Sequence, residues 1–320
     1  MKQIPLGQTG IDVSALCLGC MFFGTLTARE MAYQLADRYF EAGGRFFDTA
    51  NNYAFWIDGA TGDESETVLG RWLKSRKNRD QIILATKVGA RPGRPGGGFE
   101  SWEGLSARAI EQAVEGSLTR LGTDYLDLYY AHIDDRQTPL EETLAAFDRL
   151  VTAGKVRAIG CSNLMAWRIE QARSISRLHD WAAYCCVQQR YSYLQPRPKA
   201  TFETQIVASQ ELLDYCQIHK DFSLLAYSPL LSGAYTRQDV ALPPQYRSSD
   251  TEARLGALAT VAAETGATAN QIVLAWLLQD TPSVIPVIAA SNKTQLDENL
   301  GTLQVHLTEE HMRTLNSPDL

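Results

Sequence analysis

The chain has 320 residues, of which 45% are hydrophobic and 21% charged. These values are typical of a globular protein with a sizeable core, and they fit one α/β domain over residues 1–320. The net charge is −7 and the 30 Lys and Arg residues are scattered along the chain, which argues against a nucleic-acid or membrane-surface partner. No apolar stretch reaches the roughly 18 residues of a membrane span, and the start lacks a secretion signal, so we expect a cytoplasmic protein.

The first predicted element is a β-hairpin in KQIPLGQTGIDVS, with its turn at QTG. Eight short runs rich in β-branched or aromatic residues follow, and each is typical of a strand. They span residues 15–19, 45–48, 82–86, 125–131, 156–160, 184–188, 223–227 and 284–288.

Stretches of helical periodicity separate these strands. One helical face carries Ile110, Val114, Leu118 and Leu121, and the next carries Leu140, Leu144, Phe147 and Val151. Thr27 and Glu30 suggest a capping box for the first helix, and Pro139 suits a first helical turn. Strand followed by helix eight times over predicts a closed parallel (β/α)8 TIM barrel, with the hairpin before it and extra helices at the C-terminus.

Two connections are long, at residues 88–105 and 229–250, and the first holds a Gly-rich segment at 93–98. Such segments act as lids in some proteins and as passive links in others, and the sequence leaves this open. The six cysteines lie mostly in apolar runs, so we expect buried, reduced thiols. Cys17 and Cys20 spell CxxC without a second pair or nearby His residues, and no metal site is predicted.

The polar residues that follow the strands attract attention because TIM barrels carry their chemistry at the carboxyl ends of the strands. Asp48, Lys87, His132, Ser162, Asn163, Gln188, Tyr227, Ser228 and Ser291 all stand at such ends. We therefore expect their side chains to surround one mouth.

An aspartate, a lysine, a histidine and a nearby tyrosine suit proton transfer to a carbonyl oxygen. The phenol of Tyr53, with an ordinary pKa of about 10, needs a cation such as Lys87 to favour its ionised form. Asp48 would hold that ammonium, and neutral His132 would donate a hydrogen bond to the substrate oxygen. Hydride must then come from a nicotinamide. Singly, Asp48 could be a turn residue, Tyr53 a packed aromatic and His132 a structural histidine.

The motifs FDTANNY, ILATK, LYYAH, GCSN, VQQRYSYL, LAYSPL and AASNKTQLDENL occur in the order and spacing of the aldo-keto reductases, which this chain resembles over nearly its whole length. The resemblance implies a catalytic tetrad of Asp48, Tyr53, Lys87 and His132, with Tyr53 as general acid. It also implies cofactor contacts from the carboxamide end to the adenosine end by Gly19, Ser162, Asn163, Gln188, Tyr227, Ser228, Leu230, Arg237, Ser291, Gln295, Glu298 and Asn299.

The sequence departs from the family pattern at two places. Arg190 replaces the glutamate of the usual QNEY, so we expect different pairing there. Ala289 and Gln295 stand where many members carry a basic residue for the 2′-phosphate of NADP, and Lys293 is the cation close by. The potassium channel β subunits, which share ASN followed by Q and EN, bind NADPH. The resemblance thus favours NADP(H), with NAD(H) as the alternative.

The residues expected to line the substrate pocket are aromatic: Phe22, Phe23, Phe55, Trp56 and Trp102. Such walls suit aryl aldehydes and also sugars, so the expected substrate is a small carbonyl compound or alcohol. The long insertion AFWIDGATGDESE after Tyr53 should narrow the substrate range. The alternative function is a binding module similar to the channel β subunits, in which a retained cofactor senses redox state. The tetrad does not separate these two functions.

Overall fold

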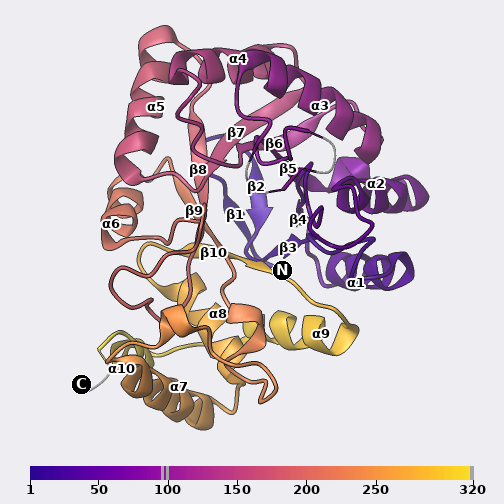
Figure 1. Ribbon diagram of the computed structural model, residues 1–320. Helices are drawn as coiled ribbons and strands as arrows, with labels where there is room; N and C mark the ends of the chain where they lie inside the picture. Colours follow the sequence, from indigo (N-terminus) through magenta and orange to yellow (C-terminus); the bar gives the residue numbers. More distant parts are fainter. Residues whose placement is uncertain (95–96, 99–100, 318–320) are drawn as a thin grey trace.

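The computed structural model describes residues 1–94, 97–98 and 101–317, and residues 95–96 of the Gly-rich segment lie outside that range. Eight parallel strands close into a barrel in the order β10-β3-β4-β5-β6-β7-β8-β9, which confirms the predicted fold class (Figure 1). The barrel strands are β3 Cys17–Gly19, β4 Phe46–Asp48, β5 Ile83–Val88, β6 Leu126–Ala131, β7 Val156–Ser162, β8 Tyr184–Arg190, β9 Ser223–Tyr227 and β10 Val284–Ile288.

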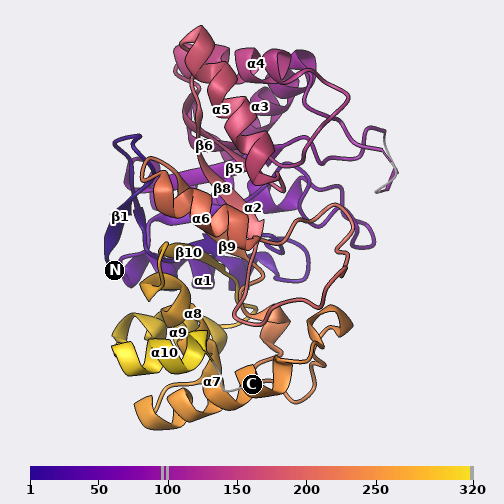
Figure 2. The same ribbon diagram turned by 90° about the vertical axis from the view of Figure 1, so that its left-hand side faces the viewer.

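Helices follow the strands and surround the barrel. They are α1 Arg29–Glu41, α2 Glu64–Arg76, α3 Ala107–Leu121, α4 Leu140–Thr152, α5 Ala166–His179, α6 Gln210–Ile218, α8 Ala269–Gln279 and α9 Lys293–Gly301. The extra helices are α7 Thr251–Thr265 and α10 Glu309–Asn316, which pack together at the lower side of Figure 1 and Figure 2. Short 3₁₀ turns occupy Arg79–Gln81, Leu231–Gly233, Pro244–Tyr246 and Thr302–Gln304.

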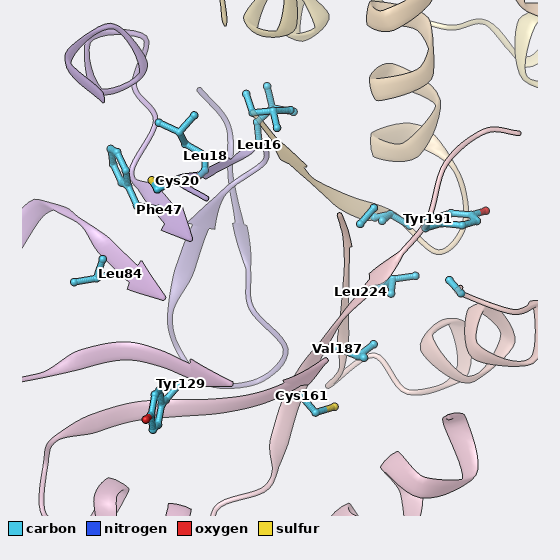
Figure 3. Packing of buried hydrophobic residues seen from close by; sticks show 14 of the residues in the cluster. Leu16, Leu18, Cys20, Phe47, Leu84, Tyr129, Cys161, Val187, Tyr191 and Leu224 are labelled. Carbon is cyan, nitrogen blue, oxygen red and sulfur yellow. Dashed lines mark hydrogen bonds between the residues drawn. The ribbon is translucent and has the colours of Figure 1, made fainter. Parts of the chain in front are cut away.

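Successive residues of each strand face opposite sides of the barrel wall, because side chains alternate along a strand. Leu84, Tyr129 and Val187 point outward to the helices in Figure 3 and belong to the larger core cluster. Their neighbours Ala85 and Leu128 lie in a second cluster inside the barrel. The same alternation turns the last inward-facing residue of several strands toward the barrel mouth.

The hairpin formed by β1 Gln3–Pro5 and β2 Asp12–Ser14 closes the amino-terminal end of the barrel. Leu6 and Val13 pack in the inner cluster with Phe46, the first residue of β4. The backbone amide of Gly7 donates to the hydroxyl of Ser223, the first residue of β9, at 2.9 Å. The hairpin therefore covers one end of the barrel, and the opposite end, at the carboxyl termini of the strands, is where the site lies.

The start of α1 differs from the sequence prediction. The helix begins at Arg29 after Ala28, and no side chain caps it. The carbonyl of Thr27 accepts a hydrogen bond from Gly24, so Thr27 belongs to the preceding turn, and Glu30 pairs with Arg29 instead of reaching back. The predicted capping box is therefore wrong. Pro139 stands one residue earlier than expected, at the N-cap position of α4.

The 229–250 connection is fastened to the loop after β8. The hydroxyl of Ser192 lies 2.7 Å from that of Tyr235 and donates to the carbonyl of Pro229 at 2.6 Å. Arg190 donates through Nε to the Tyr246 hydroxyl at 3.0 Å, and its guanidinium lies 4.6 Å from the centroid of the Phe202 ring. Arg190 thus contacts two aromatic side chains, Tyr246 and Phe202, which is the different pairing expected at this position.

All six cysteines are buried free thiols. The described part of the chain contains no group of three or more His, Cys, Asp or Glu side chains arranged to hold a metal ion. Among the described helices, none combines the length and the apolar character needed to cross a membrane.

Candidate active site

Asp48 and Lys87 occupy the inward-facing ends of the neighbouring strands β4 and β5. Asp48 is 1% exposed and Lys87 is fully buried. Charges this far from water are tolerated only when they are paired and hydrogen-bonded. Their pairing therefore explains how a lysine can end a buried strand.

The Lys87 ammonium makes three hydrogen bonds. Nζ donates to Oδ1 of Asp48, to the Tyr53 hydroxyl at 2.5 Å and to the backbone carbonyl of Thr49 at 2.8 Å. An ammonium has three donors, so its capacity is filled. The second carboxylate oxygen of Asp48, Oδ2, accepts from Nε2 of Gln188 at 2.9 Å. The lysine is thereby fixed against the tyrosine oxygen.

Tyr53 and His132 stand next to each other at the mouth. Their rings meet edge to face, with centroids 5.9 Å apart and planes at 74°. The backbone of His132 bridges two strand ends, since its amide donates to the carbonyl of Val88 and its carbonyl accepts from the side chain of Asn163. Nδ1 of His132 is buried without a partner among the described residues. The structure thus brings all four predicted tetrad side chains together.

Burial sets the protonation states of this group. It raises the pKa of the Tyr53 phenol well above its usual value, and the Asp48 carboxylate raises it further. It lowers the pKa of Lys87, although Asp48 opposes this shift. It also holds the pKa of His132 well below its usual value, with help from the Lys87 charge, so the imidazole is neutral. The expected lowering of the Tyr53 pKa by Lys87 does not dominate in this structure, because desolvation and Asp48 outweigh it.

The residues expected at the carboxamide end form a connected cluster beside the tetrad. The Tyr227 hydroxyl donates to Oδ1 of Asn163 at 2.7 Å, and the Ser162 hydroxyl donates to the backbone carbonyl of Gln188 at 2.7 Å. Asn163 adopts a left-handed backbone conformation with φ of 59°, which asparagine tolerates better than most residues. This turn places the side-chain amide of Asn163 between the end of β6 and the end of β9, where it bonds to His132 and Tyr227.

The residues expected at the adenosine end surround the start of α9. Gln295 accepts at Oε1 from the backbone amide and the hydroxyl of Ser291, at 2.9 and 2.8 Å. Glu298 accepts from the hydroxyl of Thr268 at 2.7 Å, and the buried Asn299 donates to the carbonyl of Ala289 at 3.1 Å. Hydrogen bonds thus hold these side chains near the end of β10, with Ser291 and Gln295 bonded to each other.

The remaining expected cofactor residues are less closely tied to this cluster. Ser228 has a left-handed φ of 53° after β9, and half-buried Leu230 follows it. Arg237 is exposed and pairs with Asp239. Gly19 pairs in register with Asp48, and an added Cβ there would lie 3.0 Å from Cγ1 of Val287. Gly19 therefore allows close packing at the rim.

The expected pocket aromatics differ in exposure. Phe23 is 3% exposed and packs in the outer core, so it offers little surface to a ligand, whereas Phe22 is half-buried. Trp56 is 39% exposed, and its ring meets that of Phe55 at 5.3 Å. Trp102 is half-buried and forms a β-bridge with Pro92.

Two residues that the sequence did not single out fix the loops around the mouth. Arg91 donates to the carbonyl of Asn51 at 2.8 Å and to Asp63 at 2.6 Å, which fastens the insertion after Tyr53. Glu103 accepts from the side chain of Asn51 at 2.8 Å and from the amide of Gly89 at 2.7 Å. The signal available in the sequence was the presence of two residues of opposite charge, Arg91 and Glu103, inside a connection rich in Gly and Pro.

Comparison with known proteins places this geometry in a family. The model of the Aldo/keto reductase family matches residues 15–319. The chain belongs to the aldo-keto reductases. It is 35% identical to the norsolorinic acid reductase stcV of Emericella nidulans, over 95% of this chain and 77% of that protein. It is 31% identical to the uncharacterized oxidoreductase YrpG of Bacillus subtilis, over 99% of this chain and 95% of that protein.

A solved structure agrees with this membership. The thermostable aldo-keto reductase Tm1743, in complex with the inhibitor epalrestat, superposes with a TM-score of 0.77 at 30% identity, over 99% of both chains. The chain is therefore an oxidoreductase enzyme whose family carries out nicotinamide-dependent carbonyl reduction.

Proposed function

We propose that this aldo-keto reductase interconverts a carbonyl and an alcohol with Tyr53 as general acid and, in the reverse direction, as general base. The observation that carries the proposal is the Lys87 ammonium, which binds the Tyr53 oxygen and the Asp48 carboxylate at once. The Tyr53 oxygen carries a proton and is the atom that the Lys87 charge contacts directly.

The protonation states support the forward direction. The Tyr53 phenol is protonated at neutral pH and can donate to a carbonyl oxygen as negative charge develops there, although burial and Asp48 raise its pKa and so weaken it as an acid. Lys87 then stabilises the tyrosinate that remains, and neutral His132 offers a second hydrogen bond to the same oxygen. A nicotinamide held by the residues described below would supply the hydride that the carbonyl carbon needs.

The strand-end polar groups fit a nicotinamide. Because Nε2 of Gln188 is committed to Asp48, the amide carbonyl Oε1 faces away from that carboxylate and accepts no hydrogen bond from a described residue. An acceptor in this position suits the NH₂ of the nicotinamide carboxamide. Ser162, Asn163 and Tyr227 border the same place, while Ser291, Gln295, Glu298 and Asn299 would hold the adenosine end, with Ser228, Leu230 and Arg237 between them.

The cofactor is proposed to be NADP(H), with weak discrimination against NAD(H). Gln295 is neutral, and its carbonyl oxygen accepts a hydrogen bond from Ser291. The positive charge of Arg237 is offset by Asp239. Neither side chain therefore offers an unopposed positive charge to the 2′-phosphate. Gln295→Arg is expected to improve NADPH binding by about 1 to 3 kcal/mol through a charge-assisted contact to the 2′-phosphate, with little change for NADH. Titration of each nucleotide by fluorescence quenching measures this.

Gln295→Met is the matched control, because it removes the bonds to Ser291 without adding charge. It should leave the ratio of NADPH to NADH affinity close to that of wild type. A wild-type preference for NADPH of many thousandfold would contradict the proposal and would assign the 2′-phosphate to Lys293 or Arg237.

The substrate is proposed to be an aryl carbonyl compound. The exposed ring of Trp56 and the fastened loop that carries it offer a flat apolar wall. The relationship to norsolorinic acid reductase makes norsolorinic acid a reasoned first substrate beside simple aryl aldehydes and sugars. A steady-state screen of these compounds with both cofactors tests the proposal. Multiple turnovers on aryl carbonyls are expected, and slow single-turnover oxidation of bound cofactor would instead indicate a redox sensor.

A further inference from the structure

The ring of Tyr130 lies inside the barrel next to Lys87. Tyr130 on β6 pairs in register with Lys87 on β5, and both residues are fully buried. Nζ of Lys87 lies 5.6 Å from the centroid of the Tyr130 ring and 4.5 Å from that of Tyr53. The ammonium therefore meets two aromatic rings in addition to its three oxygen partners.

The barrel wall makes room for this ring at one position. Gly160 on β7 pairs in register with Tyr130. A Cβ at Gly160 would lie 2.8 Å from Cδ1 of Tyr130 and 2.8 Å from Sγ of Cys186, which is closer than such atoms approach. Gly160 thus allows the ring to lie across the barrel interior below the mouth.

The hydroxyl group of Tyr130 does not explain why a tyrosine occupies this position. It is buried and makes no hydrogen bond of ordinary geometry with any described residue, although the weakly polar Cys186 thiol lies beside it. A phenylalanine would fill the same space without burying an unpaired hydroxyl. The aromatic ring, which lies close to Lys87, is therefore the part of Tyr130 that can affect the site.

We propose that Tyr130 is a positioning residue for Lys87. The Tyr130 ring contacts the Lys87 ammonium from the barrel interior and keeps it in place against Asp48 and Tyr53. A cation is attracted to the face of an aromatic ring, and the attraction grows when water is excluded. The role of Lys87 in turnover rests on the function proposed above, but its attraction to the ring does not.

The groups around Lys87 fix the expected sign. The titratable side chains that face it are Asp48 on β4, Tyr53 on the following loop, Cys17 and Cys20 on and after β3, and His132 after β6. Burial raises the pKa of both thiols, so they are neutral and only Asp48 offsets the cation. Loss of the ring should therefore lower the pKa of Lys87, which burial has already lowered.

The test compares Tyr130→Phe, which keeps the ring, with Tyr130→Leu and Tyr130→Met, which remove it. Tyr130→Phe should retain kcat and its pH profile within about twofold. The non-aromatic variants should shift the basic limb of kcat for carbonyl reduction to lower pH by about one unit, with KM for both substrates little changed. If all three variants share the wild-type profile, the proposal is overturned.

A second measurement needs no turnover. Lys87 binds fewer protons in the folded than in the unfolded state, so this group makes stability rise with pH between its folded and unfolded pKa values. A further drop in the folded pKa widens that window, so Tyr130→Leu should gain more in Tm from pH 7 to pH 10 than Tyr130→Phe.

Lys87→Met provides the control for the melting curves. In that background the pH-dependent difference between the Leu and Phe variants should disappear, as a double-mutant cycle requires. A difference that persists there, or that does not vary with pH, would be a packing effect and would overturn the proposal. A Lys87-dependent difference in a protein without turnover on any carbonyl would leave Tyr130 assigned and reject the proposed function alone.

Discussion

Tyr53→Phe is expected to lower turnover by roughly 10²- to 10⁴-fold while nucleotide affinity changes little. The phenol oxygen receives a hydrogen bond from Lys87 at 2.5 Å and is the proton carrier in the proposed mechanism. The substitution removes that oxygen and keeps the ring beside His132. Carbonyl reduction and alcohol oxidation should fall together, since in the proposed mechanism one atom serves both directions.

Tyr129→Phe is a matched control for this experiment. The Tyr129 hydroxyl is buried without a partner among the described residues, and its side chain points out of the barrel to the helices (Figure 3). It should keep wild-type turnover. Activity retained in Tyr53→Phe, with nucleotide titration showing normal binding, would remove Tyr53 from the chemistry.

Strand periodicity was sufficient to predict the barrel, and strand-end chemistry together with the family resemblance pointed to the four side chains that the structure brings together. The predicted strand 284–288 coincides with β10, and 223–227 coincides with β9. Because side chains alternate along a strand, Asp48 and Lys87 had to face the same side once their strands were paired. The fold could thus be derived before any contact was known.

Contacts between distant segments could not be derived in this way. The bond from Gln188 to Asp48 joins residues 140 positions apart, and the anchoring of the insertion by Arg91 depends on how two loops meet. The capping box predicted at Thr27 fits the local sequence, but in the structure Thr27 belongs to a turn in which its carbonyl accepts a hydrogen bond from Gly24. The pKa of Tyr53 was also misjudged, because a charge pattern does not reveal how much water burial removes.

The buried Lys87 connects stability to chemistry, and Lys87→Met separates them. Removing the cation leaves the Asp48 carboxylate buried beside Gln188 and Tyr53 without a compensating charge, which is expected to destabilise the fold by about 3 to 5 kcal/mol unless Asp48 takes up a proton. Circular dichroism and thermal unfolding measure this loss. The double variant Lys87→Met with Asp48→Asn removes both charges and should regain much of the stability, but none of the activity.

The pH profiles of Lys87→Met give the chemical half of the test. Without the ammonium, the pKa of Tyr53 should rise further, because the charge that favours tyrosinate is gone while burial remains. Alcohol oxidation needs the ionised phenol, so it should fall at neutral pH and recover partly as pH increases. Carbonyl reduction should fall at all pH values, because the phenol is then too weak an acid and the developing tyrosinate has no counter-charge. If Lys87→Met folds and leaves both profiles unmoved, Lys87 serves only as a structural ion pair and proton transfer must use other groups.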